Sequence, residues 1–177
     1  GLAIALLTMA YLIFGATEGK RYFQVKETTI ESKDVSQGFD GYRIVQLSDM
    51  HVGSWNGDTR AMEKAVSIIN DLQPDLIVFT GDLVNNLASE LDNFIPVFSK
   101  LKAKDGVYSV LGNHDYSTYV HWENPEDQKE EQVRLKQKQA EMGWTMLNNR
   151  HVKLYNQNDS IALIGVENSG RHPFPDY

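Results

Sequence analysis

Three apolar segments of the chain are each followed, within three residues, by side chains of the types that bind metals. The segments are Tyr42–Leu47, Leu76–Phe79 and Val107–Leu111, and their length and composition predict buried β-strands. Helical patterns alternate with them, so a parallel α/β sheet is expected, with the carboxyl ends of all three strands at one edge. Ligands collect at this edge in such sheets. The polar residues that follow the strands are therefore expected to form one site: Asp49, His51, Asp82, Asn113 and His114.

The rest of the chain supplies helices and shorter strands. Apolar periodicity and capping residues predict helices over residues 60–72, 89–101 and 125–142. Pro96 interrupts the second of these helices. The third is capped by Asn124 and is so rich in Glu, Lys and Gln that a solvated surface helix is expected. Further strands are predicted at residues 23–30, 145–147, 151–155 and 161–166.

The charge and the cysteine content limit the classes of function. The chain has 24 acidic and 17 basic residues and a net charge of −7. No nucleic acid is expected as a partner, because nucleic-acid binding needs a basic surface. A phosphorylated substrate is compatible with this charge, since bound divalent cations would be the dominant positive charges at a site. The absence of cysteine excludes disulfides, thiolate zinc sites and a cysteine nucleophile.

The chain begins with Leu2–Ala16, an almost unbroken apolar run that ends at a polar sequence. A membrane span needs about 20 apolar residues, so this run is slightly short, as a helix truncated at its start would be. We expect residues 1–17 to be a transmembrane helix, with a secretory signal and a buried globular helix as the alternatives. A cytoplasmic face for the following residues is favoured by the basic side chains after the run: Lys20, Arg21 and Lys26.

The first two motifs offer the ligands that divalent cations use. Asp49 and His51 lie two residues apart, so in extended backbone their side chains share a face and can reach one ion. Asp82 can bridge two cations with its two oxygens, and Gly81 before it permits close approach of the backbone. Each motif alone is a weak signal, because a capping Asp, a surface His and a turn Asp are common.

The third motif, residues 112–115, is more specific. Asn113 offers a neutral oxygen to a metal, and His114 can donate a proton near neutral pH. Asp115 can support that imidazole, as carboxylates around metal sites do. The aromatic loop that follows either lines a substrate pocket or packs as a small cluster: Tyr116, Tyr119, His121 and Trp122. The motifs are also followed by polar and aromatic residues whose place is left open: Ser54, Trp55, Asn85 and Asn86.

With Asp-x-His, Gly-Asp and Gly-Asn-His-Asp in this order, the chain resembles the calcineurin-like metallophosphoesterases over residues 42–115. The wider run from the apolar start to Asn168 is similar to membrane-linked bacterial members. The resemblance implies a layered α/β/β/α sandwich. It implies that Asp49 and His51 bind one divalent ion, that Asn113 binds a second, and that Asp82 bridges the two. It further implies that His114 assists as an acid or charge stabiliser.

The function implied by the resemblance is hydrolysis of a phosphomonoester, a phosphodiester or a pyrophosphate. Two divalent ions, of Mn, Fe or Zn, would hold the phosphate oxygens and generate the bound hydroxide that attacks phosphorus. The apolar helix extends this expectation to a lipid-linked substrate and to the bacterial inner membrane.

One departure from the family pattern tempers this expectation. The family's later histidine segments have no counterpart, since the context of the remaining histidines differs from them: His121, His151 and His172. We therefore expect residues 22–177 to be the amino-terminal part of the domain, with an incomplete site. The alternative is a catalytically inactive, membrane-anchored scaffold or binding protein that retains the phosphoesterase fold.

Overall fold

A computed structural model describes residues 1–168, without the side chains of Ala16 and Lys20. The chain divides into two compact units, residues 1–32 and residues 33–177. The first unit contains α1 (Leu2–Thr17) and a short 3-10 turn at Gly19–Arg21. Within the described residues, no helix combines the length and the apolar character that crossing a membrane requires.

The strand predicted at residues 23–30 is wrong, because this segment has no regular structure. A strand needs a neighbour to satisfy its backbone N–H and C=O groups. Among residues 1–168, no strand pairs with this segment. Alternating composition was therefore not sufficient to make it a strand.

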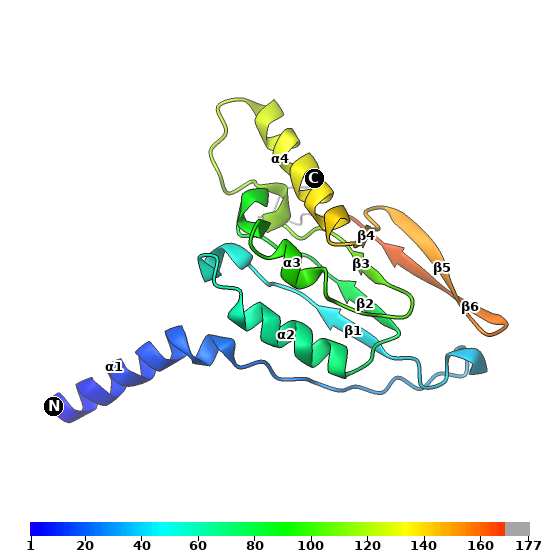
Figure 1. The fold of residues 1–177 in the computed structure, drawn as a ribbon, viewed down its shortest axis with the longest axis horizontal. Helices are drawn as coiled ribbons and strands as arrows, with labels where there is room; N and C mark the ends of the chain where they lie inside the picture. The colour runs from blue at the N-terminus through cyan, green and yellow to red at the C-terminus, as the bar shows by residue number, and fades with distance from the viewer. Residues whose placement is uncertain (169–177) are drawn as a thin grey trace. The chain divides into compact units, whose positions relative to one another are not determined.

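The second unit contains a four-stranded parallel sheet in the order β1-β2-β3-β4 (Figure 1). The strands cover Ile44–Leu47, Leu76–Phe79, Val107–Ser109 and Thr145–Met146. The three predicted apolar strands are confirmed, although β1 begins at Ile44 rather than Tyr42 and β3 ends at Ser109 rather than Leu111. Because β1, β2 and β3 are parallel, the three loops that carry the metal-binding motifs leave the sheet at one edge.

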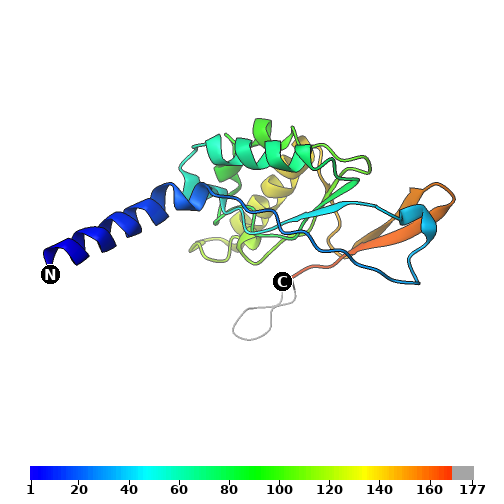
Figure 2. The same cartoon turned by 90° about the horizontal axis from the view of Figure 1, so that it is seen from below.

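Helices α2 (Arg60–Asp71), α3 (Ile95–Phe98) and α4 (Pro125–Glu141) lie on one side of this sheet (Figures 1 and 2). The predictions of α2 and α4 are confirmed, and Asn124 caps α4 by accepting a hydrogen bond from the Glu126 amide at 3.1 Å. The single helix predicted over residues 89–101 is wrong. The chain forms a 3-10 turn at Ala88–Leu91 and then starts α3 with Pro96 in its first turn. Proline has no N–H and crowds the preceding turn, so a helix starts at it more readily than it passes through it.

The core lies between the sheet and these helices. Phe79 of β2 packs against Trp144, with ring centroids 5.3 Å apart, and Trp144 in turn packs against Phe98 of α3 at 5.7 Å. On the same face of the sheet, the buried hydroxyl of Ser109 donates to the side-chain oxygen of Gln139 in α4 at 2.6 Å. These contacts hold the strand ends, and hence the loops that follow them, in fixed relative positions.

A separate two-stranded antiparallel sheet follows the core, formed by β5 (Arg150–Asn156) and β6 (Asp159–Gly165). The strands predicted at residues 151–155 and 161–166 are therefore confirmed as strands. The predicted α/β class is confirmed by the parallel sheet and its helices. The further layers of the sandwich stay a prediction.

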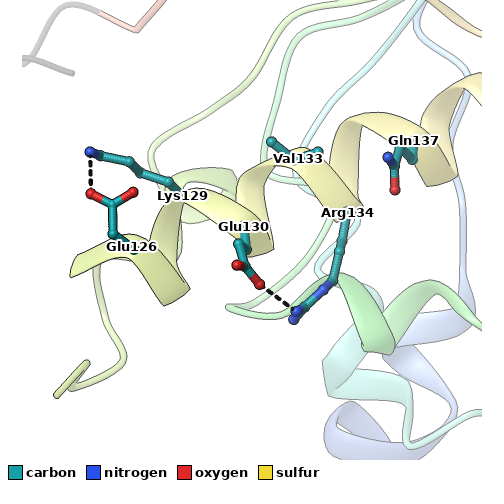
Figure 3. Close-up of a pocket in the computed structure, with 6 residues that line it drawn as sticks. All are labelled: Glu126, Lys129, Glu130, Val133, Arg134 and Gln137. Atoms are coloured by element: carbon teal, nitrogen blue, oxygen red, sulfur yellow. Dashed lines mark hydrogen bonds and ion pairs between the residues drawn. The ribbon is translucent and has the colours of Figure 1, made fainter. Parts of the chain in front are cut away.

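The outer face of α4 is solvated, as predicted, and is covered by charged side chains (Figure 3). Lys129 pairs with Glu126 at 2.8 Å and Arg134 pairs with Glu130 at 3.0 Å. These residues border a shallow hollow of about 350 Å³. Exposed pairs of this kind add little stability, so α4 is held by its inner side.

We predict that two truncations in α4 differ sharply in their effect on stability. Leu135 is 1% exposed and Val133 is 52% exposed. Leu135→Ala should lower the free energy of unfolding by about 2–5 kcal/mol, because it leaves a cavity in the core. Val133→Ala, on the same helix, should change it by about 0.5 kcal/mol or less. Urea denaturation of the full-length protein measures both, and equal effects would show that α4 is not packed as described.

Candidate metal centre

The loops after β1 and β2 are joined by backbone hydrogen bonds that continue the pairing of the strands. The Asp49 amide donates to the Gly81 carbonyl at 3.0 Å, and the His51 amide donates to the Asp82 carbonyl at 3.1 Å. The next amide, of Val52, donates to Leu83 at 3.0 Å. The first two motifs are therefore held side by side by the backbone itself.

Three of the predicted metal ligands have a left-handed backbone conformation. The φ angles are 56° for Asp49, 40° for His51 and 59° for Asp82. This region is costly for residues other than glycine, and such conformations gather at functional sites. The Asp49 and His51 amides bond to the loop after β2, and the Asp82 amide bonds to the Asp115 carboxylate. The surrounding loops therefore maintain a geometry that the isolated chain would avoid.

Two glycines allow the second and third loops to touch. A side chain on Gly81, whose φ is 101°, would place its Cβ 2.4 Å from the Gly112 nitrogen. A side chain on Gly112 would place its Cβ 2.3 Å from an oxygen of Asp82. Both positions therefore require glycine, and the close approach brings the Asp82 carboxylate to the start of the third motif. There it accepts a hydrogen bond from the His114 amide at 2.9 Å.

The structure brings the predicted site residues together. The His51 Nε2 atom lies 3.9 Å from a carboxylate oxygen of Asp49 and 3.9 Å from one of Asp82. The His51 and His114 rings have centroids 4.7 Å apart. One possible ligand atom from each of His51, Asp82 and His114 lies within 4.8 Å of the others. Asp49, Asp82 and Asn113 also line one cleft of about 500 Å³.

The donors around this cleft fit divalent cations. Its described lining contains three carboxylates, from Asp49, Asp82 and Glu167, and neither lysine nor arginine. Carboxylate, imidazole and amide oxygen donors at one place are the set that Mn, Fe and Zn sites use. Glu167, which the sequence analysis did not single out, is held by the Asn149 side chain at 2.7 Å. Glu167 belongs to no local motif. It follows β6 in the sequence, and only the folded chain places it beside the cleft.

Asp115 holds the loops together. Its buried carboxylate accepts four backbone hydrogen bonds of 2.8 to 3.2 Å, and the donors are the amides of Asp82, Leu83, Val84 and Gly112. The pKa of Asp115 is raised to about 6, mainly by burial, although the hydrogen bonds from Gly112 and Val84 act in the opposite direction. Its recorded hydrogen bonds, within the described residues, do not include the predicted contact with the His114 imidazole. Asp115 instead joins the second and third motifs through these backbone hydrogen bonds.

The His114 imidazole is oriented by Asn85 instead. The Nδ1 atom lies 2.8 Å from the Asn85 carbonyl oxygen, and a carbonyl can only accept, so Nδ1 carries the proton. The Nε2 atom is left to bind a cation when neutral or to donate a proton when the ring is charged.

Asn85 is itself fixed from both sides. Its side chain bonds the Ser54 amide at 3.0 Å and the Ser54 hydroxyl at 2.8 Å. The backbone N–H of Asn85 donates to the Glu90 carboxylate at 2.6 Å. The same carboxylate accepts from the backbone amides of Asn86 and Leu87. The sequence left the place of Ser54 and Asn85 open, and it missed Glu90 because its partners are backbone groups.

The other histidines do not join this cluster. His121 and His151 are exposed, and neither belongs to the metal-ligand group found among the described residues. His172 lies outside the described residues. In the aromatic loop, Tyr116 is buried, as the packing alternative expects, whereas Tyr119 is exposed and stacks on His114. A pocket-lining role of this loop stays a prediction.

Comparisons with known proteins agree with these motifs. Residues 42–172 match the family profile described as calcineurin-like phosphoesterase. The uncharacterized metallophosphoesterase YkuE of Bacillus subtilis is 38% identical over 98 residues, which cover 54% of this chain and 34% of that protein. A transmembrane protein with metallophosphoesterase domain of Danio rerio is 30% identical over 113 residues, covering 64% and 26%.

A third relative carries a named activity. The UDP-2,3-diacylglucosamine pyrophosphatase LpxG of Chlamydia muridarum is 41% identical over 81 residues, which cover 45% of this chain and 24% of that protein. The matched part thus spans only about a quarter to a third of the length of these three relatives.

We predict that Asp115→Asn destabilises the fold. Asparagine offers one oxygen where aspartate offers two, so two buried amide donors lose their partner and face an NH₂ group, at about 1–3 kcal/mol each. Removal of the buried charge offsets part of this loss, and the expected net decrease in unfolding free energy is about 2–4 kcal/mol. The matched control is Asp71→Asn at the exposed end of α2. Urea denaturation in EDTA measures both variants, and equal stability would contradict the role of Asp115.

Proposed function

The chain belongs to the calcineurin-like phosphoesterase family, and on that premise we propose that it carries the catalytic centre, or part of it, of a metal-dependent hydrolase of phosphoester bonds. The observation that carries the proposal is the convergence of Asp49, His51 and Asp82 at the carboxyl edge of the sheet, beside Asn113 and His114. The family follows from the profile match. The carboxylate, imidazole and amide oxygen donors support the use of a metal.

Each residue has a proposed role. Asp49 and His51 would hold one ion and Asn113 a second, with Asp82 between them. Bound divalent ions act as Lewis acids on phosphoryl oxygens and lower the pKa of water, so that a nucleophile is available at neutral pH. The mixture of nitrogen and oxygen donors suits Mn, Fe or Zn better than Mg.

His114 is proposed to serve the leaving group. Its Nδ1 proton is engaged by the Asn85 carbonyl, so the proton that can be transferred is the one on Nε2. Donation of that proton to the leaving oxygen is general acid catalysis, which contributes roughly 10²–10⁴-fold. The Asn85 contact keeps the ring from rotating, which preserves the direction in which this proton is presented.

For the substrate, we propose a pyrophosphate that links a nucleotide to a lipid-bearing sugar. The support is the activity named for the Chlamydia relative. The chain itself carries a net charge of −7, so attraction of such an anion would depend on the bound cations rather than on the protein surface. Attachment to a membrane stays a prediction, supported by the apolar run Leu2–Ala16 and by the name of the Danio rerio relative.

We predict that Asp82→Ala and His114→Ala in the full-length protein fail in different ways. Asp82→Ala should remove most of the bound metal, because its carboxylate lies between both proposed ion positions. His114→Ala should keep the metal and lower turnover roughly 10²–10⁴-fold. The measurements are metal content by mass spectrometry and hydrolysis of bis-p-nitrophenyl phosphate.

The matched control for Asp82 is Asp71→Ala, which removes an exposed carboxylate of α2 and should change neither value. Loss of metal from His114→Ala to the same extent as from Asp82→Ala would make His114 a ligand and remove its assigned role. A metal-loaded wild type that hydrolyses no phosphoester would favour the inactive scaffold over the enzyme.

The substrate proposal gives a further prediction. With metal bound, the full-length protein should release UMP from a UDP-linked diacylated glucosamine faster than it hydrolyses a simple phosphodiester. Chromatographic detection of UMP distinguishes cleavage of the pyrophosphate from removal of the sugar, which would release UDP. Release of UDP, or turnover of the simple diester alone, would contradict the proposed substrate while leaving the phosphoesterase activity intact.

A further inference from the structure

An exposed tyrosine contacts two residues of the proposed centre at once. The Tyr119 hydroxyl accepts a hydrogen bond from the Asn113 side-chain nitrogen at 2.8 Å. Its ring stacks on the His114 ring, with centroids 4.5 Å apart and an angle of 28° between the planes. Tyr119 nevertheless remains 53% exposed, so it stands at the rim and is not part of the hydrophobic core.

The loop that carries Tyr119 is anchored at both of its ends. Tyr116 is 4% exposed, and its carbonyl accepts hydrogen bonds from α4, of which the Gln128 side chain gives one at 2.9 Å. The Trp122 indole donates to the Ser117 carbonyl at 2.7 Å and closes the loop. The position of Tyr119 is therefore set by neighbours on either side of it and not by its own burial.

The hydrogen bond to Asn113 stabilises the orientation of the amide that the structure shows. An asparagine amide has an oxygen that can bind a cation and an NH₂ group that cannot. The two ends have nearly the same shape, so an amide without a fixed partner can turn and present either one. A hydrogen bond from the nitrogen to the Tyr119 hydroxyl leaves the oxygen as the free end.

The stack on His114 completes a three-sided enclosure of that ring. Asn85 engages Nδ1 at 2.8 Å, and the His51 ring lies at its edge with planes at 85°. The Tyr119 ring occupies a face. The ring thus has little freedom to move away from Asp82 and His51.

We infer that Tyr119 is a positioning residue of the metal centre: its hydroxyl keeps the Asn113 amide oxygen free for the second cation, and its ring holds His114. The inference rests on the proposed function, since it assigns the metal site to Asn113. The hydroxyl and the ring of Tyr119 thus have separate roles, and two substitutions can test them separately.

The test is a titration of the metal-free, full-length protein with Mn²⁺ alone. Calorimetry and electron paramagnetic resonance measure the binding. Tyr119→Phe removes the hydroxyl and keeps the ring. We expect it to weaken the second Mn²⁺-binding event by about 10–100-fold, the usual effect of losing a group that orients a ligand, and to leave the first event unchanged. Tyr119→Leu should weaken the second event equally and, at saturating Mn²⁺, also lower kcat, because only this variant loses the stack.

A carboxylate at position 113 provides the sharpest control. Aspartate has an oxygen at both ends, so its orientation no longer matters. Beside an aspartate the Tyr119 hydroxyl can only donate to a carboxylate oxygen. Tyr119→Phe made in the Asn113→Asp background should therefore weaken the second Mn²⁺-binding event less than it does beside Asn113, which gives a coupling energy in the double-mutant cycle. Tyr155→Phe, on exposed β5, is the matched control for loss of a hydroxyl and should bind Mn²⁺ as the wild type does.

The outcomes separate this inference from the proposed function. Wild-type binding of both Mn²⁺ ions by Tyr119→Phe overturns the inference alone. An equal loss of affinity in the Asn113→Asp background overturns it as well, because the effect would then not pass through the amide. Weakening of the second event only, in a protein without phosphoesterase activity, supports the inference and refutes the proposed activity.

Discussion

Four backbone amides from two loops converge on the buried carboxylate of Asp115, and the arrangement of the whole centre depends on this contact. It ties the loop after β2 to the loop after β3 at the point where Gly81 and Gly112 lie back to back. The first loop is then aligned on the second by backbone hydrogen bonds from Asp49, His51 and Val52. The predicted metal-binding side chains, on the loops that follow three separate strands, are in this way brought to within a few ångströms of one another.

The same arrangement explains how an acidic chain can serve anionic chemistry. The cleft gathers carboxylates that repel one another and that no described lysine or arginine of its lining neutralises. Bound cations would stabilise such a cluster and would then attract a phosphate. Orientation is left to neutral groups: the Asn85 carbonyl for His114 and the Tyr119 hydroxyl for Asn113. Neutral partners can fix these two side chains without competing for a cation.

The parts of the fold that the sequence predicted correctly are those with a local physical signal. The apolar runs of β1 to β3 and the capped, periodic patterns of α2 and α4 each carry such a signal. The segment at residues 23–30 did not, because a strand is defined by a partner that sequence alternation cannot supply. The helix over residues 89–101 was broken by Pro96, whose effect on local geometry outweighed the apolar periodicity.

The candidate site likewise contains features with a local signal in the sequence and features without one. Motif order placed Asp49, His51, Asp82, Asn113 and His114 at one edge, and the structure brings them together. The contacts that orient them were not predictable, because Asp115, Glu90 and Asn85 act on or through backbone groups. Asp115, which was predicted to support the His114 imidazole, instead accepts hydrogen bonds that join the loops.

We propose that this edge of the sheet binds two cations that share Asp82. The most direct measurement is anomalous diffraction from crystals of the full-length protein soaked in Mn²⁺. We expect two peaks in the cleft, roughly 4 Å apart, each about 2.0–2.3 Å from an oxygen of Asp82. No peak in the cleft, or a single peak that Asp82 does not contact, would contradict it.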